Sequence, residues 1–154
     1  MRMSAQISGC GSYRYSLTRD WGPGGYVMFI GLNPSTADAT MDDPTIRRCI
    51  GYAKDWGYQK LVMTNLFAYR STDPTIMKQS NDPIGPDNDM YLIGLAQNSS
   101  LIVAAWGTNG SFNGRDISVR KMINNMHYLK MTKGGHPSHP LYLSKTLKPV
   151  KWEK

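Results

Sequence analysis

A buried strand that ends in a sharp turn, at residues 26–35, constrains this sequence most. Residues 26–30 read Tyr-Val-Met-Phe-Ile, and such a β-branched and aromatic run is typical of a strand covered on both faces. Gly31, Asn33 and Pro34 follow, so the turn lies at the carboxyl end of the strand. Ligands bind at this end of the strands in open parallel α/β sheets. We therefore expect functional residues here, although Asn-Pro is also common in an ordinary strand-to-helix turn.

The rest of the chain alternates between strand-like and helix-like segments. Apolar runs predict further strands at residues 61–68, 101–106 and 127–131. Amphipathic patterns predict helices at residues 44–56, 86–97 and 115–126. Strands that alternate with helices are typical of a parallel sheet with helices on both faces. The predicted fold is a three-layer α/β/α sandwich with a central four-stranded, mainly parallel sheet, in a single domain over residues 1–154.

The first of these helices has the clearest end signals. Asp43 suits the N-cap and Pro44 the first turn, while Gly57 suits the left-handed residue that ends a helix. The stretch at 69–85 is predicted to be a loop. In the other two helices the residues predicted to face the core are Met90, Ile93, Ala96, Ile117, Val119, Met122, Ile123 and Met126.

An N-terminal β-hairpin is predicted before the central strand. Residues 13–19 alternate in the period of a half-exposed strand, and the glycine-rich residues 22–25 form a turn that leads into the next strand. Arg14 and Arg19 are five residues apart, so a regular strand would point them to opposite faces. At most one of them is then expected to join a given site.

The net positive charge of this chain lies entirely in its C-terminal quarter. Residues 1–114 hold 9 basic and 9 acidic side chains, whereas residues 115–154 hold 9 basic and 2 acidic ones, which accounts for the net charge of +7. Such a segment is typical of a surface that faces phosphates, with Lys133, Lys145 and Lys148 at the mouth of the site. A solvated lysine-rich tail is an equally good interpretation.

Cysteine usage and hydropathy limit the class of protein. Cys10 and Cys49 are too few and too far apart in sequence for a zinc site or an iron–sulfur cluster, and we expect two free thiols. No residues are predicted to bind a metal or a cofactor. The chain lacks an apolar run long enough to cross a membrane, and its first residues lack the apolar core of a signal peptide. We expect a cytoplasmic monomer with no membrane partner.

The ends of the predicted strands resemble, in order, the motifs of the uracil-DNA glycosylase superfamily. These ends read Gly-Leu-Asn-Pro-Ser at 31–35, Thr-Asn-Leu at 64–66, Ala-Trp-Gly at 105–107 and His-Pro-Ser at 136–138. The first motif is most similar to that of the mismatch-specific branch. Over residues 13–142 the chain looks still more like a small family of bacterial and phage proteins recorded as a domain of unknown function.

The glycosylase resemblance implies specific roles for a few of these residues. Asn33 matches the residue that positions the attacking water, and Asn65 matches the residue that reads a flipped base through its amide. His136 or His139 matches the histidine that donates to a base carbonyl as negative charge develops there. An extra residue in the closing motif leaves both histidines open. Each of these residues also has a purely structural explanation, as a turn cap, a strand end or a rigid loop residue.

The resemblance and the position of residues near the motifs extend the set of candidates. For base binding it comprises Leu32, Pro34, Ser35, Asn65, Phe67, Trp106 and Ser138. For contacts to phosphate or DNA it comprises Arg47, Arg48, Arg70 and Lys133. Three functions stay open: a DNA glycosylase-like hydrolase that removes an altered base, an enzyme of the same fold that acts on a free modified nucleotide, and a catalytically silent module that binds a nucleotide or DNA.

Overall fold

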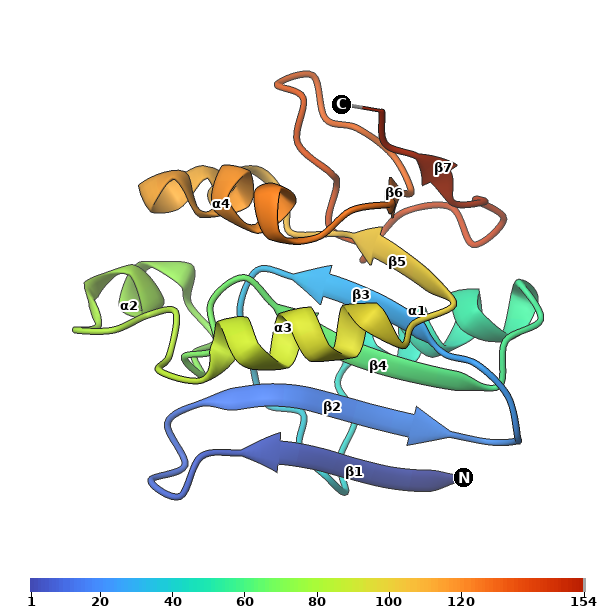
Figure 1. Ribbon diagram of the computed structural model, residues 1–154, viewed down its shortest axis with the longest axis horizontal. Coiled ribbons are helices and arrows are strands. Elements are labelled where there is room, and N and C mark those ends of the chain that lie inside the picture. Colours follow the sequence, from blue (N-terminus) through green and yellow to red (C-terminus); the bar gives the residue numbers. More distant parts are fainter. Residues whose placement is uncertain (154) are drawn as a thin grey trace.

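A computed structural model describes residues 1–153 and has one seven-stranded mixed sheet (Figure 1). The strand order is β1-β2-β4-β3-β5-β6-β7. The strands are β1 (Arg2–Ile7), β2 (Arg14–Asp20), β3 (Val27–Gly31), β4 (Lys60–Asn65), β5 (Leu101–Ala104), β6 (Met126–Tyr128) and β7 (Val150–Lys151). The prediction of an α/β fold is confirmed, but the prediction of a four-stranded sheet is wrong.

The four predicted strands form the parallel centre of this larger sheet. β3 pairs in parallel with β4 on one side and β5 on the other, and β5 pairs in parallel with β6. Antiparallel strands complete both edges, since β1 and β2 extend the sheet beyond β4 and β7 pairs with β6. The prediction missed β1 and β7 because β1 is polar and largely exposed and β7 has only two residues. These strands gain their order from pairing rather than from a hydrophobic pattern.

The predicted hairpin exists with a different partner. β2 pairs with β1 and, on its other side, with β4, so residues 22–25 do not form a hairpin turn between β2 and β3. β4 lies between β2 and β3 in the sheet, so these two consecutive strands are not neighbours. A local turn signal does not identify the strand that will be the neighbour, because that choice is made by packing of the whole sheet.

Helices cover both faces of the sheet. They are α1 (Pro44–Asp55), α2 (Pro74–Gln79), α3 (Asn88–Gln97) and α4 (Arg115–Met122), with a 3-10 segment η1 (Thr108–Gly114) before α4. One apolar cluster joins α1 to β3 through Phe29, Ile46 and Cys49. A second cluster joins α3 and α4 to the opposite face through Leu92 and Val119. Figure 1 shows α3 crossing in front of the strands and α1 behind them.

The best-marked helix is confirmed, whereas the other helices differ from the prediction. The carboxylate of Asp43 accepts from Ile46 N at 2.9 Å, and Gly57 follows the helix with a φ of +85°. α3 and α4 are shorter than expected, and α2 and η1 were not predicted. Three residues assigned to the core, Met90, Ile93 and Ile117, are exposed, while Met126 belongs to β6. Val119 and Ile123 are buried as predicted, so the apolar spacing gave the wrong rotation for α3 but not for α4.

An irregularity in β2 changes which face its first residues occupy. The register passes from Gln6 opposite Ser16 to Ile7 opposite Arg14, so Tyr15 is an extra residue in the strand. Tyr15 stacks on Tyr91 of α3, with 4.9 Å between ring centroids, whereas Leu17 packs in the cluster on the α1 side. The bulge therefore shifts the alternation of side chains and brings Arg14 to the α1 side.

The C-terminal segment packs against α1 instead of trailing free. Arg48 Nη1 donates to Leu143 O at 2.7 Å, Tyr52 Oη to Ser144 O at 2.6 Å and Trp56 Nε1 to Leu147 O at 3.0 Å. Two donors of α1 and one from its C-cap residue Trp56 thus hold the backbone of residues 143–147. Among residues 1–153, the helices are all too short or too polar to cross a bilayer.

Candidate functional site

A small pocket lies where β3 and β4 end, on the face of the sheet that α1 covers. Its volume is about 190 Å³. The two strand ends are direct neighbours, because Gly31 pairs with Asn65. The residues that line the pocket are Arg14, Gly31, Leu32, Asn33, Pro34, Ser35, Asp43, Thr45, Ile46, Met63, Asn65, Ser71, Thr72, Pro74 and His139. The carboxyl edge of the parallel strands is thus hollowed, as expected for a ligand site in this kind of sheet.

Asn33 connects two loops at the pocket. Its Nδ2 donates to the carbonyl oxygens of Pro34 at 3.3 Å, Tyr69 at 3.3 Å and Ser71 at 2.9 Å. The amide nitrogen is therefore committed to protein carbonyls. The remaining polar atom of this side chain is Oδ1, which can only accept hydrogen bonds. An acceptor at this position can orient a water molecule but cannot remove its proton.

Asn65 is buried beneath the pocket and is only 3% exposed. Its Nδ2 has no hydrogen-bond partner among residues 1–153. A Cβ atom at position 31 would lie 2.9 Å from Asn65 Oδ1 and 3.0 Å from Met63 Cε, so the glycine at the end of β3 leaves space for this amide. A buried donor without a partner is costly, and in a pocket it can be satisfied by a ligand acceptor.

His139 lines the pocket and is exposed to solvent. Leu141 N donates to its Nδ1 at 3.2 Å, so the neutral ring carries its proton on Nε2. Burial of the ring lowers the pKa of His139, and the nearby charge of Asp43 opposes this shift. The geometry therefore favours a neutral imidazole with Nε2–H as its donor.

His136 occupies a different place from His139. It sits at a tight turn, where its backbone nitrogen donates to Thr132 Oγ1 at 3.1 Å and its carbonyl accepts from Thr132 N at 2.8 Å. It does not line the pocket. Ser138 N donates to Lys130 O at 2.8 Å, and Lys133 is exposed in the same turn. Among residues 136–139, only His139 lines the pocket.

The aromatic residues expected near the site are on the other face of the sheet. Phe67 and Trp106 both belong to the cluster that packs under α3 and α4, and neither lines the pocket. The expectation that Trp106 joins the cleft is therefore wrong. Ala105 faces the α1 side, so its neighbour Trp106 must face away. The apolar surface of the pocket comes instead from Leu32, Ile46 and Met63.

A second, larger cavity lies on the other side of the first turns of α1. Its volume is about 370 Å³, and its lining includes Arg47, Arg48 and Lys145. Pro44 lines this cavity while Asp43 and Thr45 line the first one, so the two are neighbours around the start of the helix. The predicted phosphate residues of α1 thus lie beside the pocket and not inside it. Arg70 lies apart from both, where its Nη1 donates to Gly11 O at 3.3 Å.

Two charged residues of the pocket were not among the predicted site residues. Arg14 is only 2% exposed, and its Nη1 donates to Ala37 O at 3.0 Å. Asp43 caps α1 and also lines the pocket. The sequence held a signal for Asp43, as the cap of the helix that follows the turn. It held none for Arg14, because a regular strand pattern does not reveal the bulge at Tyr15.

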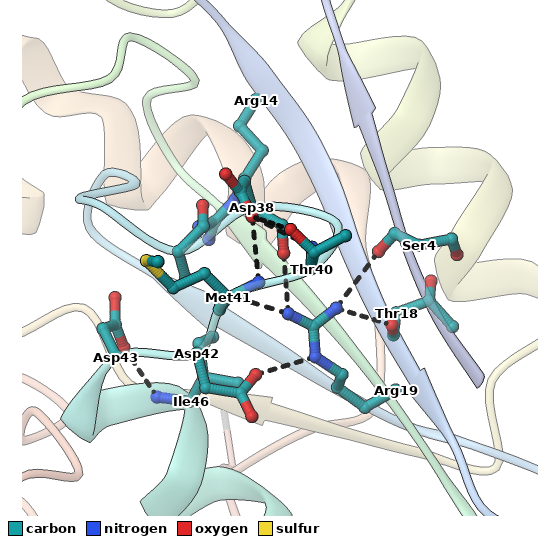
Figure 2. A network of polar contacts seen from close by, with 11 residues as sticks. Ser4, Arg14, Thr18, Arg19, Asp38, Thr40, Met41, Asp42, Asp43 and Ile46 are labelled. Atoms are coloured by element: carbon teal, nitrogen blue, oxygen red, sulfur yellow. Dashed lines mark hydrogen bonds and ion pairs between the residues drawn. The ribbon is translucent and has the colours of Figure 1, made fainter. Parts of the chain in front are cut away.

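Arg19 fixes the loop that closes one side of this region (Figure 2). Its Nε donates to Asp42 Oδ1 at 2.7 Å, and its Nη2 donates to Asp38 O at 2.6 Å and Met41 O at 3.3 Å. The Asp38 carboxylate accepts from the backbone nitrogens of Thr40 and Met41 within the loop. These acidic residues are thus used to shape the loop. Within residues 1–153, no group of three His, Cys, Asp or Glu side chains is arranged to hold a metal ion.

Comparison with known proteins gives one match. A family model covers residues 14–141, which is nearly the span of 13–142 over which the sequence resembles a domain of unknown function. Neither a curated protein nor a solved structure matches the chain. The likeness to uracil-DNA glycosylases therefore rests on the four short motifs alone. The chain belongs to the family described as Protein of unknown function (DUF1643).

Proposed function

We propose that this protein hydrolyses the N-glycosidic bond of an altered or modified base in DNA, in the manner of a glycosylase. The observation that carries the proposal is that Asn33, Asn65 and His139 line one pocket at the carboxyl ends of parallel strands. These residues come from three distant segments of the chain. Asn33 and Asn65 match motifs of the glycosylase superfamily, and His139 is one of the two histidines that the resemblance left open for the closing motif. Their convergence supports a common site, because unrelated loop residues have no reason to meet.

The size of the pocket favours a base as the bound group. A volume of about 190 Å³ corresponds to roughly six water molecules. It is smaller than the pockets that enclose drug-sized ligands. A single nucleobase fits such a space, whereas the sugar and phosphate of its nucleotide would remain outside. The base must therefore leave the stack of a duplex to enter the pocket.

Each polar residue has a role that its contacts permit. Asn33 Oδ1 accepts from the attacking water and directs it toward the anomeric carbon of the sugar. Asn65 Nδ2 donates to an acceptor on the edge of the base. His139 donates from Nε2 to the base as it departs with the bonding electron pair. Because Asn33 cannot take a proton, we expect the fastest reaction with bases that leave as stable anions.

An enzyme of the same kind that acts on a free modified nucleotide is the second candidate. The neighbouring cavity with Arg47, Arg48 and Lys145 favours it, since it places basic groups beside the pocket where a phosphate could bind. Salt dependence separates the two candidates. Binding to duplex DNA weakens steeply as salt rises, because several phosphates are neutralised at once. A single nucleotide shows a much weaker dependence.

The test is a panel of oligonucleotides that carry uracil, mismatched bases and bulky modified bases, together with modified free nucleotides. Released base and abasic sites are measured. We expect the wild-type protein to cleave at least one member of the panel. Asn33→Ala should cleave that substrate about 100-fold more slowly with little loss of binding, since Asn33 acts in the transition state. His139→Gln should slow the poorest leaving groups most.

His136→Gln is the matched control, because His136 lies outside the pocket. It should retain full activity. Activity that survives both Asn33→Ala and His139→Gln would overturn the assignment of this site. If no member of the panel is cleaved but modified bases bind, the protein is a catalytically silent binding module and the hydrolase proposal fails.

A further inference from the structure

Arg14 is a buried cation with almost no internal partners. It is 2% exposed, and the only hydrogen bond of its side chain within residues 1–153 runs from Nη1 to Ala37 O. Its Nε is buried and has no hydrogen-bond partner in this part of the chain. No carboxylate of residues 1–153 lies within ion-pair distance of it. A buried guanidinium normally requires an anion and several acceptors, and Arg14 has neither.

Arg14 differs in this respect from the two other buried arginines. Arg19 pairs with Asp42 and donates to backbone carbonyls, and Arg115 pairs with Asp89 at 2.6 Å and donates to Leu66 O at 2.9 Å. Both are thus compensated inside the protein. Arg14 is the one of the three that lines the pocket. Its unused donors are therefore placed beside the space that a ligand would occupy.

The negative charges around Arg14 are engaged elsewhere. Asp43 also lines the pocket, but its carboxylate accepts from Ile46 N and lies at the positive end of the α1 dipole. The Asp38 carboxylate accepts from backbone nitrogens in its own loop. Burial lowers the pKa of Arg14 to about 10, with Asp43 acting in the opposite direction. The side chain is therefore still positively charged at neutral pH.

We propose that Arg14 forms an anion subsite within the pocket and that the ligand is a pyrimidine-sized base with a carboxylate substituent. A planar carboxylate matches the fork of a guanidinium through two parallel hydrogen bonds, and in a buried site such a pair is strong. The unpaired Asn65 Nδ2 supplies a neutral donor for the ring itself. This inference rests on the proposed function and names its substrate class.

The first test compares free bases binding to the wild-type protein by calorimetry. Uracil-5-carboxylate and its 6-carboxylate isomer carry the anion in two positions, while uracil-5-carboxamide has the same shape without charge. We expect one carboxylate to bind at least about tenfold more tightly than both the carboxamide and uracil. Acetate and inorganic phosphate, which lack the ring, should bind more weakly than that carboxylate. Equal affinity for the carboxylates and the carboxamide would overturn the inference.

The second test assigns the preference to Arg14. Arg14→Met should abolish the difference between carboxylate and carboxamide, and Arg14→Lys should retain only part of it because an ammonium lacks the planar fork. Lys121→Met removes an exposed charge from α4 and should leave the preference intact. If the variants at position 14 do not fold, the wild-type comparison of carboxylate and carboxamide still decides the question. A preference that persists in a folded Arg14→Met protein would place the anion elsewhere.

The outcomes also separate this inference from the proposed function. If uracil binds and oligonucleotides are cleaved without any preference for a carboxylate, the hydrolase proposal stands and the anion subsite is wrong. If acetate and phosphate bind as tightly as the carboxylated bases and depend on Arg14, the inference as stated is also overturned, because the ring is then not recognised. That result would count against base binding in this pocket as well.

Discussion

Arg14 and Arg19 stand five residues apart on β2 and both donate hydrogen bonds to successive carbonyls of the same loop. Arg14 Nη1 reaches Ala37 O at 3.0 Å, and Arg19 Nη2 reaches Asp38 O at 2.6 Å (Figure 2). A regular strand would have turned them to opposite faces, yet both reach the same loop, although only Arg14 lines the pocket. The bulge at Tyr15 accounts for the difference. One arginine shapes the loop, and the other lines the pocket beside it.

Asp42→Ala should destabilise the protein, because it leaves the fully buried Arg19 without its carboxylate. We expect a loss of about 3 kcal/mol in the free energy of unfolding, the lower end for a broken buried pair, since Asp42 is partly exposed. Arg2→Ala breaks an exposed ion pair with Asp20 and should cost less than about 1 kcal/mol. Urea unfolding measures both. Similar losses in the two variants would show that the Arg19 network does not stabilise the loop.

Gly31→Ala should disturb the pocket from below. The new methyl group would lie 2.9 Å from Asn65 Oδ1 and 3.0 Å from Met63 Cε, so the Asn65 amide must move. We expect a loss of about 1–3 kcal/mol in stability and weaker binding of base ligands. Gly51→Ala is the matched control in α1, where a Cβ meets nothing within 4 Å. That change should stabilise the protein by about 0.5–1 kcal/mol and leave binding unaltered. Unchanged ligand affinity in Gly31→Ala would argue against a role for Asn65.

Protonation of His139 should occur below the ordinary range for histidine. Burial lowers its pKa, so between that lowered pKa and about 6.5 the unfolded chain binds more protons than the folded one. Stability contributed by this residue is therefore present above pH 6.5 and lost as the pH falls through the lowered pKa. NMR titration of the ring measures the midpoint. Protonation adds a proton to Nδ1 and breaks the hydrogen bond from Leu141 N, while the Nε2–H donor stays in place. His139→Gln should remove this step from the pH dependence of stability. A midpoint above 6.5 would contradict this lowered pKa.

Cys10 should be the reactive thiol of the chain. Hydrogen bonds with Ser8 and Ser12 lower its pKa to about 7, and the residue is exposed. Cys49 is fully buried, and burial raises its pKa far above the ordinary value. Because the thiolate is the nucleophile, alkylation by iodoacetamide should rise through pH 7 and label one site. Peptide mapping identifies it, and Ser8→Ala should move the midpoint upward. Equal labelling of both cysteines in the folded protein would contradict this prediction.

Local chemistry in the sequence determined the central elements of this protein. The apolar runs of β3, β4 and β5 are long enough to mark buried strands, and Asp43, Pro44 and Gly57 define α1 at both ends. Each of these signals depends on neighbouring residues only. The strand-end positions of Asn33 and Asn65 followed from the same signals, because parallel strands bring their carboxyl ends to one edge.

Tertiary structure decided the features that depend on distant parts of the chain. Pairing with β4 placed β2 at the edge of the parallel strands, and the bulge at Tyr15 turned Arg14 toward α1. The packing of residues 139–147 across α1 placed His139 at the pocket while His136 stayed in a turn. In α3, Leu92 faces the core, whereas the predicted core residues Met90 and Ile93 are exposed. The sequence held no local signal for these outcomes, since register, rotation and the close approach of loops are set by the summed packing of the whole domain.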